Sequence, residues 1–206
     1  MREKSQWQIQ VEKNPGHSQW YIQRFKTMQE AGNDIYGEAR LIDALIPRAA
    51  KILDAGCGPG RLGTYLHNAG HTVTGVDIDS ELIAEAQRVC PEATWVCADL
   101  SDLREALGES PDAELGANGF DAIVCAGNVM TFLAPSTRLP VLENMRATLS
   151  DSGRAVIGFG ANRGYDFEQF FADAAAARLQ VEQKFSTWDL RPFSQDSGFL
   201  VAVLTR

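Results

Sequence analysis

The chain has 206 residues, of which 45% are hydrophobic, so it suits one α/β domain with a sizeable core and is not a disordered polymer. It has no apolar run of the roughly eighteen residues that a membrane span needs, and its first ten residues lack the apolar stretch of a secretory signal. We therefore expect a cytoplasmic protein with no membrane partner. The net charge of −8, without a Lys/Arg cluster, argues against a nucleic-acid partner and favours a small-molecule substrate, and it carries no signal for an oligomeric state.

Two amphipathic helices are expected before the first strand. Tyr21, Phe25 and Met28 recur at the i, i+4, i+7 spacing of one helix face, which predicts a helix over 18–29. A second apolar pattern predicts a helix over 38–46. The predicted organisation is a helical cap at 1–47 followed by one domain at 48–206.

The sequence KILDAGCGPGRLGTYL, residues 51–66, has the pattern of a strand, a glycine turn and a helix. A short apolar run ends at Asp54, and Gly56, Gly58 and Gly60 follow at alternate positions. Glycine has no Cβ, so the backbone can take positive φ and approach a ligand closely. The pattern therefore predicts a ligand at this turn, and Asp54 favours a cationic group there over a diphosphate.

Strands and helices alternate from residue 51 onward, which predicts an α/β fold with a doubly wound, mostly parallel sheet. Seven strands are expected at 51–55, 72–77, 94–98, 120–126, 154–159, 179–187 and 198–205. Helices are expected at 60–68, 80–88, near 101–107, at 136–149 and at 166–177, with a surface loop at 108–119. The last two strands are joined by a loop without a helix, so they are expected to form a C-terminal antiparallel hairpin.

The segment LDAGCGPG resembles the first motif of class I methyltransferases that depend on S-adenosyl-L-methionine, and the resemblance spans about residues 50–206. A seven-stranded sheet that ends in a hairpin is similar to the sheet of that family. The resemblance implies S-adenosylmethionine as cofactor and in-line transfer of its methyl group to a small-molecule acceptor. Alignment of nucleophile, methyl and sulfur supplies most of such a rate, so no catalytic triad is expected.

Two other hypotheses stay open. Gly58, Gly60 and Gly63 match the G-x-G-x-x-G pattern of an NAD(P)-dependent oxidoreductase, and Asp77 suits the ribose of either cofactor. Asp54 and the terminal hairpin argue against that enzyme. The third hypothesis is a non-catalytic module that binds S-adenosylmethionine beside a plugged substrate pocket.

Ligands of open α/β sheets bind at the carboxyl ends of the strands, which directs attention to four strand ends. Asp77 can accept hydrogen bonds from two ribose hydroxyls, whereas Asp79 better suits the N-cap of the next helix. The resemblance implies that Asp99 and Leu100 contact adenine. The predicted cofactor-binding residues are Asp54, Ala55, Gly56, Cys57, Gly58, Gly60, Asp77, Ile78, Asp99, Leu100, Ala126, Gly127, Asn128 and Arg24.

Three side chains are candidates for catalysis. Asn128 offers both a donor and an acceptor at the end of the fourth strand. His17 or Tyr21 could act as a base if the first predicted helix covers the methyl group, and Arg24 could then pair with the methionine carboxylate. The structural alternative is a solvated turn histidine beside a helix that only packs.

The four cysteines predict no metal site, because none forms a C-x-x-C pair. Cys97 and Cys125 lie in apolar strand patterns and are expected to be buried. At Cys57 the backbone is expected to matter more than the sulfur. His67 is explained by its place at a helix C-terminus, where positive charge is favourable.

Overall fold

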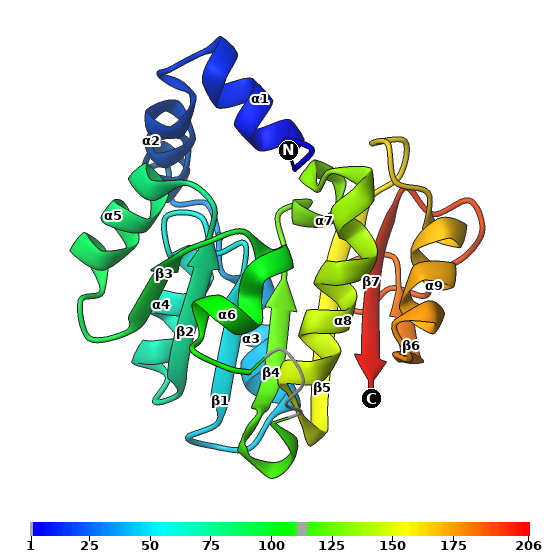
Figure 1. Ribbon diagram of the computed structural model, residues 1–206. Helices are drawn as coiled ribbons and strands as arrows, with labels where there is room; N and C mark the ends of the chain where they lie inside the picture. Colours follow the sequence, from blue (N-terminus) through cyan, green and yellow to red (C-terminus); the bar gives the residue numbers. More distant parts are fainter. Residues whose placement is uncertain (1, 111–114) are drawn as a thin grey trace.

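The computed structural model describes residues 2–110 and 115–206, which form a seven-stranded sheet with helices on both faces (Figure 1). The strands lie in the order β3-β2-β1-β4-β5-β7-β6. Their bounds are Lys51–Ala55 (β1), Thr72–Asp77 (β2), Thr94–Cys97 (β3), Phe120–Cys125 (β4), Leu149–Gly160 (β5), Gln180–Phe185 (β6) and Phe199–Thr205 (β7). Strands β1 to β5 are parallel, which confirms the predicted fold class. Part of the expected surface loop, residues 111–114, lies outside the described residues.

One face of the sheet is covered by α3 (Gly37–Leu45), α4 (Arg61–Asn68) and α5 (Ser80–Val89). Ile42 of α3 and Leu66 of α4 are fully buried in one core cluster with Ile52 of β1. Burial of each such side chain stabilises the fold by about 1.5–3 kcal/mol. Helix α3 was expected to belong to the N-terminal cap, but its apolar face packs against α4 and the sheet instead.

The opposite face is covered by α6 (Leu103–Ala106), α8 (Arg138–Thr148) and α9 (Phe167–Ala176). Their buried side chains, such as Met145 and Phe170, share a second core with Ile157 of β5 and Leu204 of β7. Short 3₁₀ turns at Leu100–Asp102 (η1), Gly116–Asn118 (η2) and Pro135–Thr137 (η3) and the one-turn helix α7 (Val129–Phe132) complete the connections.

The C-terminal strands confirm the predicted hairpin. Strand β7 lies between β5 and β6 and is antiparallel to both. Strand β5 begins at Leu149, five residues before its expected start, because its pairing with β4 shifts register between Phe120 and Ala122. Such a bulge admits extra residues, so the residues between Leu149 and Arg154 belong to the strand although the sequence placed them before it.

The N-terminal helices lie across the carboxyl edge of the parallel strands (Figure 1). Helix α2 (His17–Glu30) was predicted, whereas α1 (Gln6–Lys13) was not. Helix α1 begins with a capping box, in which the Ser5 hydroxyl accepts from the Gln8 amide and the Gln8 side chain accepts from the Ser5 amide. We call residues 2–30 the cover segment.

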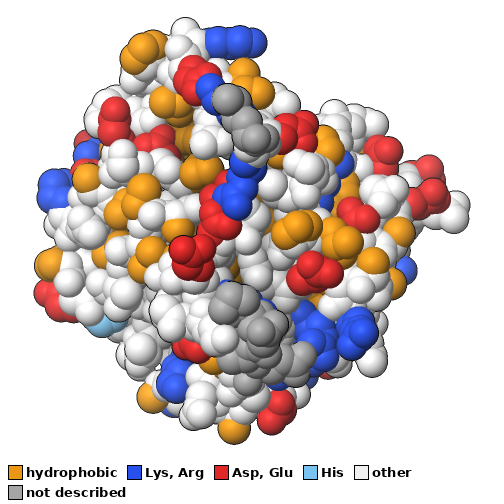
Figure 2. All heavy atoms as spheres, in the orientation of Figure 1, with side chains coloured by type: hydrophobic (Ala, Val, Ile, Leu, Met, Phe, Trp, Pro, Cys, Tyr) orange, Lys and Arg blue, Asp and Glu red, His pale blue; other side chains and the backbone are white. Residues whose placement is uncertain are grey.

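The surface in Figure 2 carries Asp and Glu side chains spread among Lys and Arg. Among the described residues, no helix has both the length and the hydropathy to cross a bilayer. Cys125 is buried as expected, but Cys97 is exposed because it ends β3, the edge strand of the sheet.

Candidate active site

A cavity of about 700 Å³ opens at the carboxyl ends of β1 to β4, beneath the cover segment. Its floor includes Gly58, Asp77 and Asp99 from three successive strand ends, and Trp7 and Tyr21 come from the cover segment. Its lining is mostly apolar with a few polar groups, as is usual for small-molecule and cofactor sites. We call it the larger cavity.

A second space of about 370 Å³ adjoins it, and we call this the smaller cavity. Tyr21, Gly56, Gly58 and Gly127 are among the residues that line both spaces. Asp54 lines only the smaller cavity, together with Cys57, Ala126 and Arg61. The two cavities therefore lie side by side and share part of their lining at the glycine turn.

The three glycines of the turn have different neighbours. All have positive φ: 77° at Gly56, 54° at Gly58 and 80° at Gly60. A Cβ on Gly60 would lie 2.9 Å from Trp95, whereas a Cβ on Gly58 would meet only Tyr21, at 3.5 Å. Gly58 thus leaves space on the cavity side, while Gly60 lines neither cavity and is required for packing. This corrects the expectation that all three glycines admit a ligand.

Asp77 connects the end of β2 to the glycine turn. Its carboxylate accepts hydrogen bonds from the amides of Gly58 and Asp79, both at 2.9 Å. Burial raises the pKa of Asp77 to about 6. The carboxylate therefore holds the turn in place while it lines the larger cavity.

Asp54 lies deeper, at the end of β1, and is 2% exposed. It accepts a hydrogen bond of 3.0 Å from the amide of Gly63, one of the unpaired N–H groups in the first turn of α4. Burial raises the pKa of Asp54 to about 7. The cation nearest on the lining, Arg61, is already paired with both oxygens of Glu38.

The end of β3 presents an apolar wall and one acid. Ile78, Ala98 and Leu100 line the larger cavity beside Asp99. Oδ1 of Asp99 accepts from the amide and the hydroxyl of Ser101, each at 2.8 Å, so Asp99 itself caps the following turn.

Trp7, Tyr21 and Phe132 form an aromatic group on the lining of the larger cavity. The sequence analysis did not identify Trp7 as part of the site. The Trp7 ring packs edge-on against Tyr21 at 5.2 Å and Phe132 at 5.8 Å, measured between ring centroids. Its indole N–H donates to Oδ2 of Asp79 at 2.8 Å. The only local signal for this part of the site is the capping box at Ser5.

Polar contacts fix the cover segment to three loops at the strand ends. Asp79 accepts from Trp7 and also from the hydroxyl of Ser18 at 2.5 Å, while it caps α5 as predicted. The carboxylate of Glu3 accepts from the Ser136 hydroxyl at 2.7 Å. Arg2 forms an ion pair with Asp102. The segment thus spans the β2–α5 loop, the turn after β3 and the turn before α8.

Of the catalytic candidates, the structure brings only Tyr21 to the cavities. His17 stacks on Trp20 and makes a tilted contact with Trp7, and the Arg24 guanidinium is exposed over the Trp20 ring. The side-chain oxygen of Asn128 accepts from the Gly160 amide at 2.8 Å, so it ties β4 to β5. None of these three lines either cavity. Ala55, also predicted, is fully buried in the core instead.

The fold and this strand-end site define a class I methyltransferase-type domain. A family model described as a methyltransferase domain matches residues 52–153. The solved TehB-like S-adenosylmethionine-dependent methyltransferase of Corynebacterium glutamicum is 53% identical, with a TM-score of 0.84, and the match covers 94% of this chain and 100% of that one. The chain belongs to the S-adenosylmethionine-dependent methyltransferase family.

Two curated relatives agree with this family. Trans-aconitate 2-methyltransferase of Delftia acidovorans is 36% identical over 169 residues, which is 74% of this chain and 59% of the relative. The relative YqeM of Bacillus subtilis is 26% identical over 168 residues, which is 78% of this chain and 64% of that protein. The chain thus spans less than two thirds of the length of these two relatives. An NAD(P)-dependent oxidoreductase is not favoured by these comparisons.

Proposed function

We propose that this protein transfers the methyl group of S-adenosylmethionine to a small-molecule acceptor. The observation that carries this proposal is the charge of the site. Asp54 and Asp77 are buried carboxylates that line two adjoining cavities, and Arg61 is already paired with Glu38. A ligand with a sulfonium and an ammonium group compensates buried carboxylates, whereas a dinucleotide would bring a diphosphate toward them.

The lining residues fit the parts of such a cofactor. Asp77 at the tip of β2 would accept from the ribose hydroxyls, and Asp99 with the apolar wall around Leu100 would hold the adenine. Gly58 leaves backbone accessible at the turn. Asp54, in the smaller cavity, would face the cationic methionine end.

Bound S-adenosylmethionine supplies an activated methyl group on a sulfonium. The chain's own residues then have to position the acceptor and exclude water. Trp7 and Phe132 cover the larger cavity with aromatic surface. Burial raises the pKa of Tyr21, which favours its protonated hydroxyl as a hydrogen-bond donor over a role as the base.

A small-molecule acceptor is supported by the relatives. The Delftia acidovorans relative is named for methylation of trans-aconitate, and a Streptomyces fradiae relative, 29% identical over 134 residues, is named as an N,N-dimethyltransferase of a dTDP-amino sugar. These names differ in the atom that is methylated. We therefore propose the small-molecule class without a particular acceptor atom.

The test uses methyl-labelled S-adenosylmethionine and a metabolite extract. The protein is expected to transfer label to a small organic molecule, which is then identified by mass spectrometry. Ligand binding is measured separately by the shift in melting temperature. S-adenosylmethionine at a hundred times its dissociation constant is expected to stabilise the fold by about 2.7 kcal/mol, and NAD is expected to give no shift.

Two outcomes would overturn the proposal. If NAD stabilises the fold and S-adenosylmethionine does not, the cofactor is a dinucleotide and the proposed reaction is wrong. Tight binding of S-adenosylmethionine without labelled product in any extract would identify a binding module that has lost its transfer activity.

A further inference from the structure

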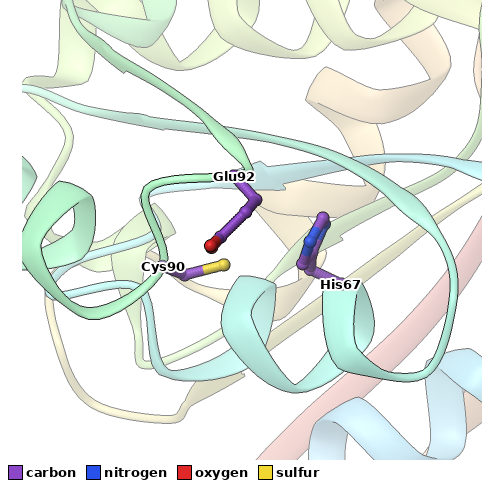
Figure 3. Close-up of side chains that lie close together, drawn as sticks. All are labelled: His67, Cys90 and Glu92. Carbon is purple, nitrogen blue, oxygen red and sulfur yellow. The ribbon is translucent and has the colours of Figure 1, made fainter.

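Three side chains of types that can bind a metal, those of His67, Cys90 and Glu92, lie close together (Figure 3), and none of them lines either cavity. His67 lies in the last turn of α4, Cys90 caps the C-terminus of α5, and Glu92 follows in the next loop. One ligand atom of each lies within 4.8 Å of the other two. Helices α4 and α5 both run back from the carboxyl edge of the sheet, so this cluster lies at the opposite edge.

The three side chains are not engaged elsewhere. Across residues 2–110 and 115–206, none of them makes a side-chain hydrogen bond or an ion pair. His71, four residues after His67, is a contrast, since its ring bonds both the Ala50 amide and Asp43. A favourable helix C-terminal charge explains His67 alone. It does not explain why the Cys90 thiol and the Glu92 carboxylate both lie close to the His67 imidazole.

The cluster has one fixed ligand and two adaptable ones. Cys90 is 3% exposed, its amide donates to Ala86 at 2.9 Å, and its carbonyl accepts from the Trp95 indole at 2.7 Å. Glu92 is exposed and His67 is half-buried, so both can adjust. Ligand atoms of a tetrahedral Zn²⁺ site lie about 3.3–3.7 Å apart, since the metal–ligand bonds are about 2.0–2.3 Å. A small contraction of the two adaptable side chains is enough.

We propose that His67, Cys90 and Glu92 bind one borderline-soft divalent cation of the Zn²⁺ class, with water as the fourth ligand. Imidazole nitrogen, thiolate sulfur and carboxylate oxygen are all ligands that Zn²⁺ accepts. Binding releases the thiol proton of Cys90 to solvent. The ion would tie the end of α4 to the end of α5, and the proposal does not depend on which reaction the protein catalyses.

Cobalt substitution tests this site on the full chain. Co²⁺ added to the metal-free protein is expected to bind once per chain, with a thiolate-to-cobalt charge-transfer band and the strong visible absorption of four-coordinate Co²⁺. Zn²⁺ is expected to displace it and to abolish both signals. Cys90→Ser is expected to remove the charge-transfer band, and His67→Gln to weaken Co²⁺ binding by about tenfold or more.

Cys97→Ser is the matched control, because Cys97 is the exposed cysteine outside the cluster. It is expected to leave the cobalt spectrum unchanged. Circular dichroism checks that each variant is folded, and if Cys90→Ser is not, His67→Gln decides the question. The proposal is overturned if Co²⁺ gives no charge-transfer band, if the band survives Cys90→Ser, or if His67→Gln binds as tightly as the wild type.

Discussion

Asp77 and Asp79, two residues apart, have separate roles. Asp77 supports the glycine turn and lines the larger cavity, while Asp79 caps α5 and accepts from Trp7 and Ser18 of the cover segment. The sequence predicted the strand end at Asp77 and the cap at Asp79, because both follow from local pattern. It could not predict the contacts that Asp79 makes with residues more than sixty positions away.

Asp77→Ala is expected to weaken S-adenosylmethionine binding by about thirty- to a thousandfold. Hydrogen bonds from two ribose hydroxyls to a carboxylate contribute roughly 1.5–3 kcal/mol each. Water that enters the site recovers part of this energy, which leaves a loss of binding free energy of about 2–4 kcal/mol. Each loss of about 1.4 kcal/mol raises the dissociation constant tenfold. Calorimetric titration measures the loss directly.

The control for this variant is Thr72→Ala, at the exposed start of the same strand. Its dissociation constant is expected to stay within about twofold of the wild type, as for most surface substitutions. Equal affinity of Asp77→Ala and the wild type would show that the ribose is held elsewhere.

At the scale of elements, the cover segment is the part of the molecule that local sequence described least well. Helix α1 is eight residues long and has no buried residue, so its apolar pattern is weak. Its position depends on tertiary contacts of Trp7, Glu3 and Arg2 with loops that are distant in sequence. The S-x-x-Q capping box at Ser5 could have indicated the helix, but not where it lies.

Trp7→Ala is expected to weaken S-adenosylmethionine binding by about ten- to a hundredfold. The substitution removes two aromatic contacts, each worth about 0.5–1.5 kcal/mol beyond the buried area, and one hydrogen bond to a carboxylate. Trp7→Phe keeps a ring beside Tyr21 and Phe132 and loses only the indole donor, so it is expected to fall between Ala and the wild type. Calorimetric titration measures the affinity of both variants for S-adenosylmethionine. If neither affinity differs from that of the wild type, Trp7 does not have a covering role.

For the whole molecule, the sequence was a good guide wherever periodicity and topology decide the outcome. The alternation after residue 51 predicted the sheet, and the missing helix before β7 predicted the antiparallel end. It was a poor guide where a residue is required by packing contacts that form only in the folded protein. Gly60 looked like a ligand contact, but it is required because Trp95 and Ala86 fill the space beside it. The sequence also did not indicate that His67, Cys90 and Glu92 lie close together, because only the fold brings the ends of α4 and α5 side by side.

The ligand-free protein is expected to lose stability as the pH rises from 5 to 8. Burial raises the folded-state pKa of Asp54 to about 7 and that of Asp77 to about 6, against about 3.9 in the unfolded chain. The folded state therefore holds these protons more tightly, so their contribution is fully present below about pH 4 and is lost as the pH passes the folded values. The shift at Asp54 corresponds to up to about 4 kcal/mol.

Urea denaturation of the wild type and of Asp54→Asn at several pH values measures this effect. Asparagine stays neutral, so the unfolding free energy of the wild type is expected to fall relative to that of the variant between pH 5 and 8. A difference that is constant with pH would mean that Asp54 is ionised throughout this range.

The Asp79 amide donates a hydrogen bond of 2.9 Å to the Asp77 carboxylate, so the positions of these two residues depend on each other. Whatever fixes Asp77 also fixes the acceptor that holds Trp7 and Ser18. Such coupling is reciprocal: if bound S-adenosylmethionine makes opening of the cover rarer by some factor, an opened cover weakens the ligand by that same factor. We therefore expect the ligand to slow amide hydrogen exchange in α1 and to leave α3, on the sheet face, unchanged. In that case the demethylated cofactor would leave only after the cover segment opens, and this release step would limit the rate of turnover.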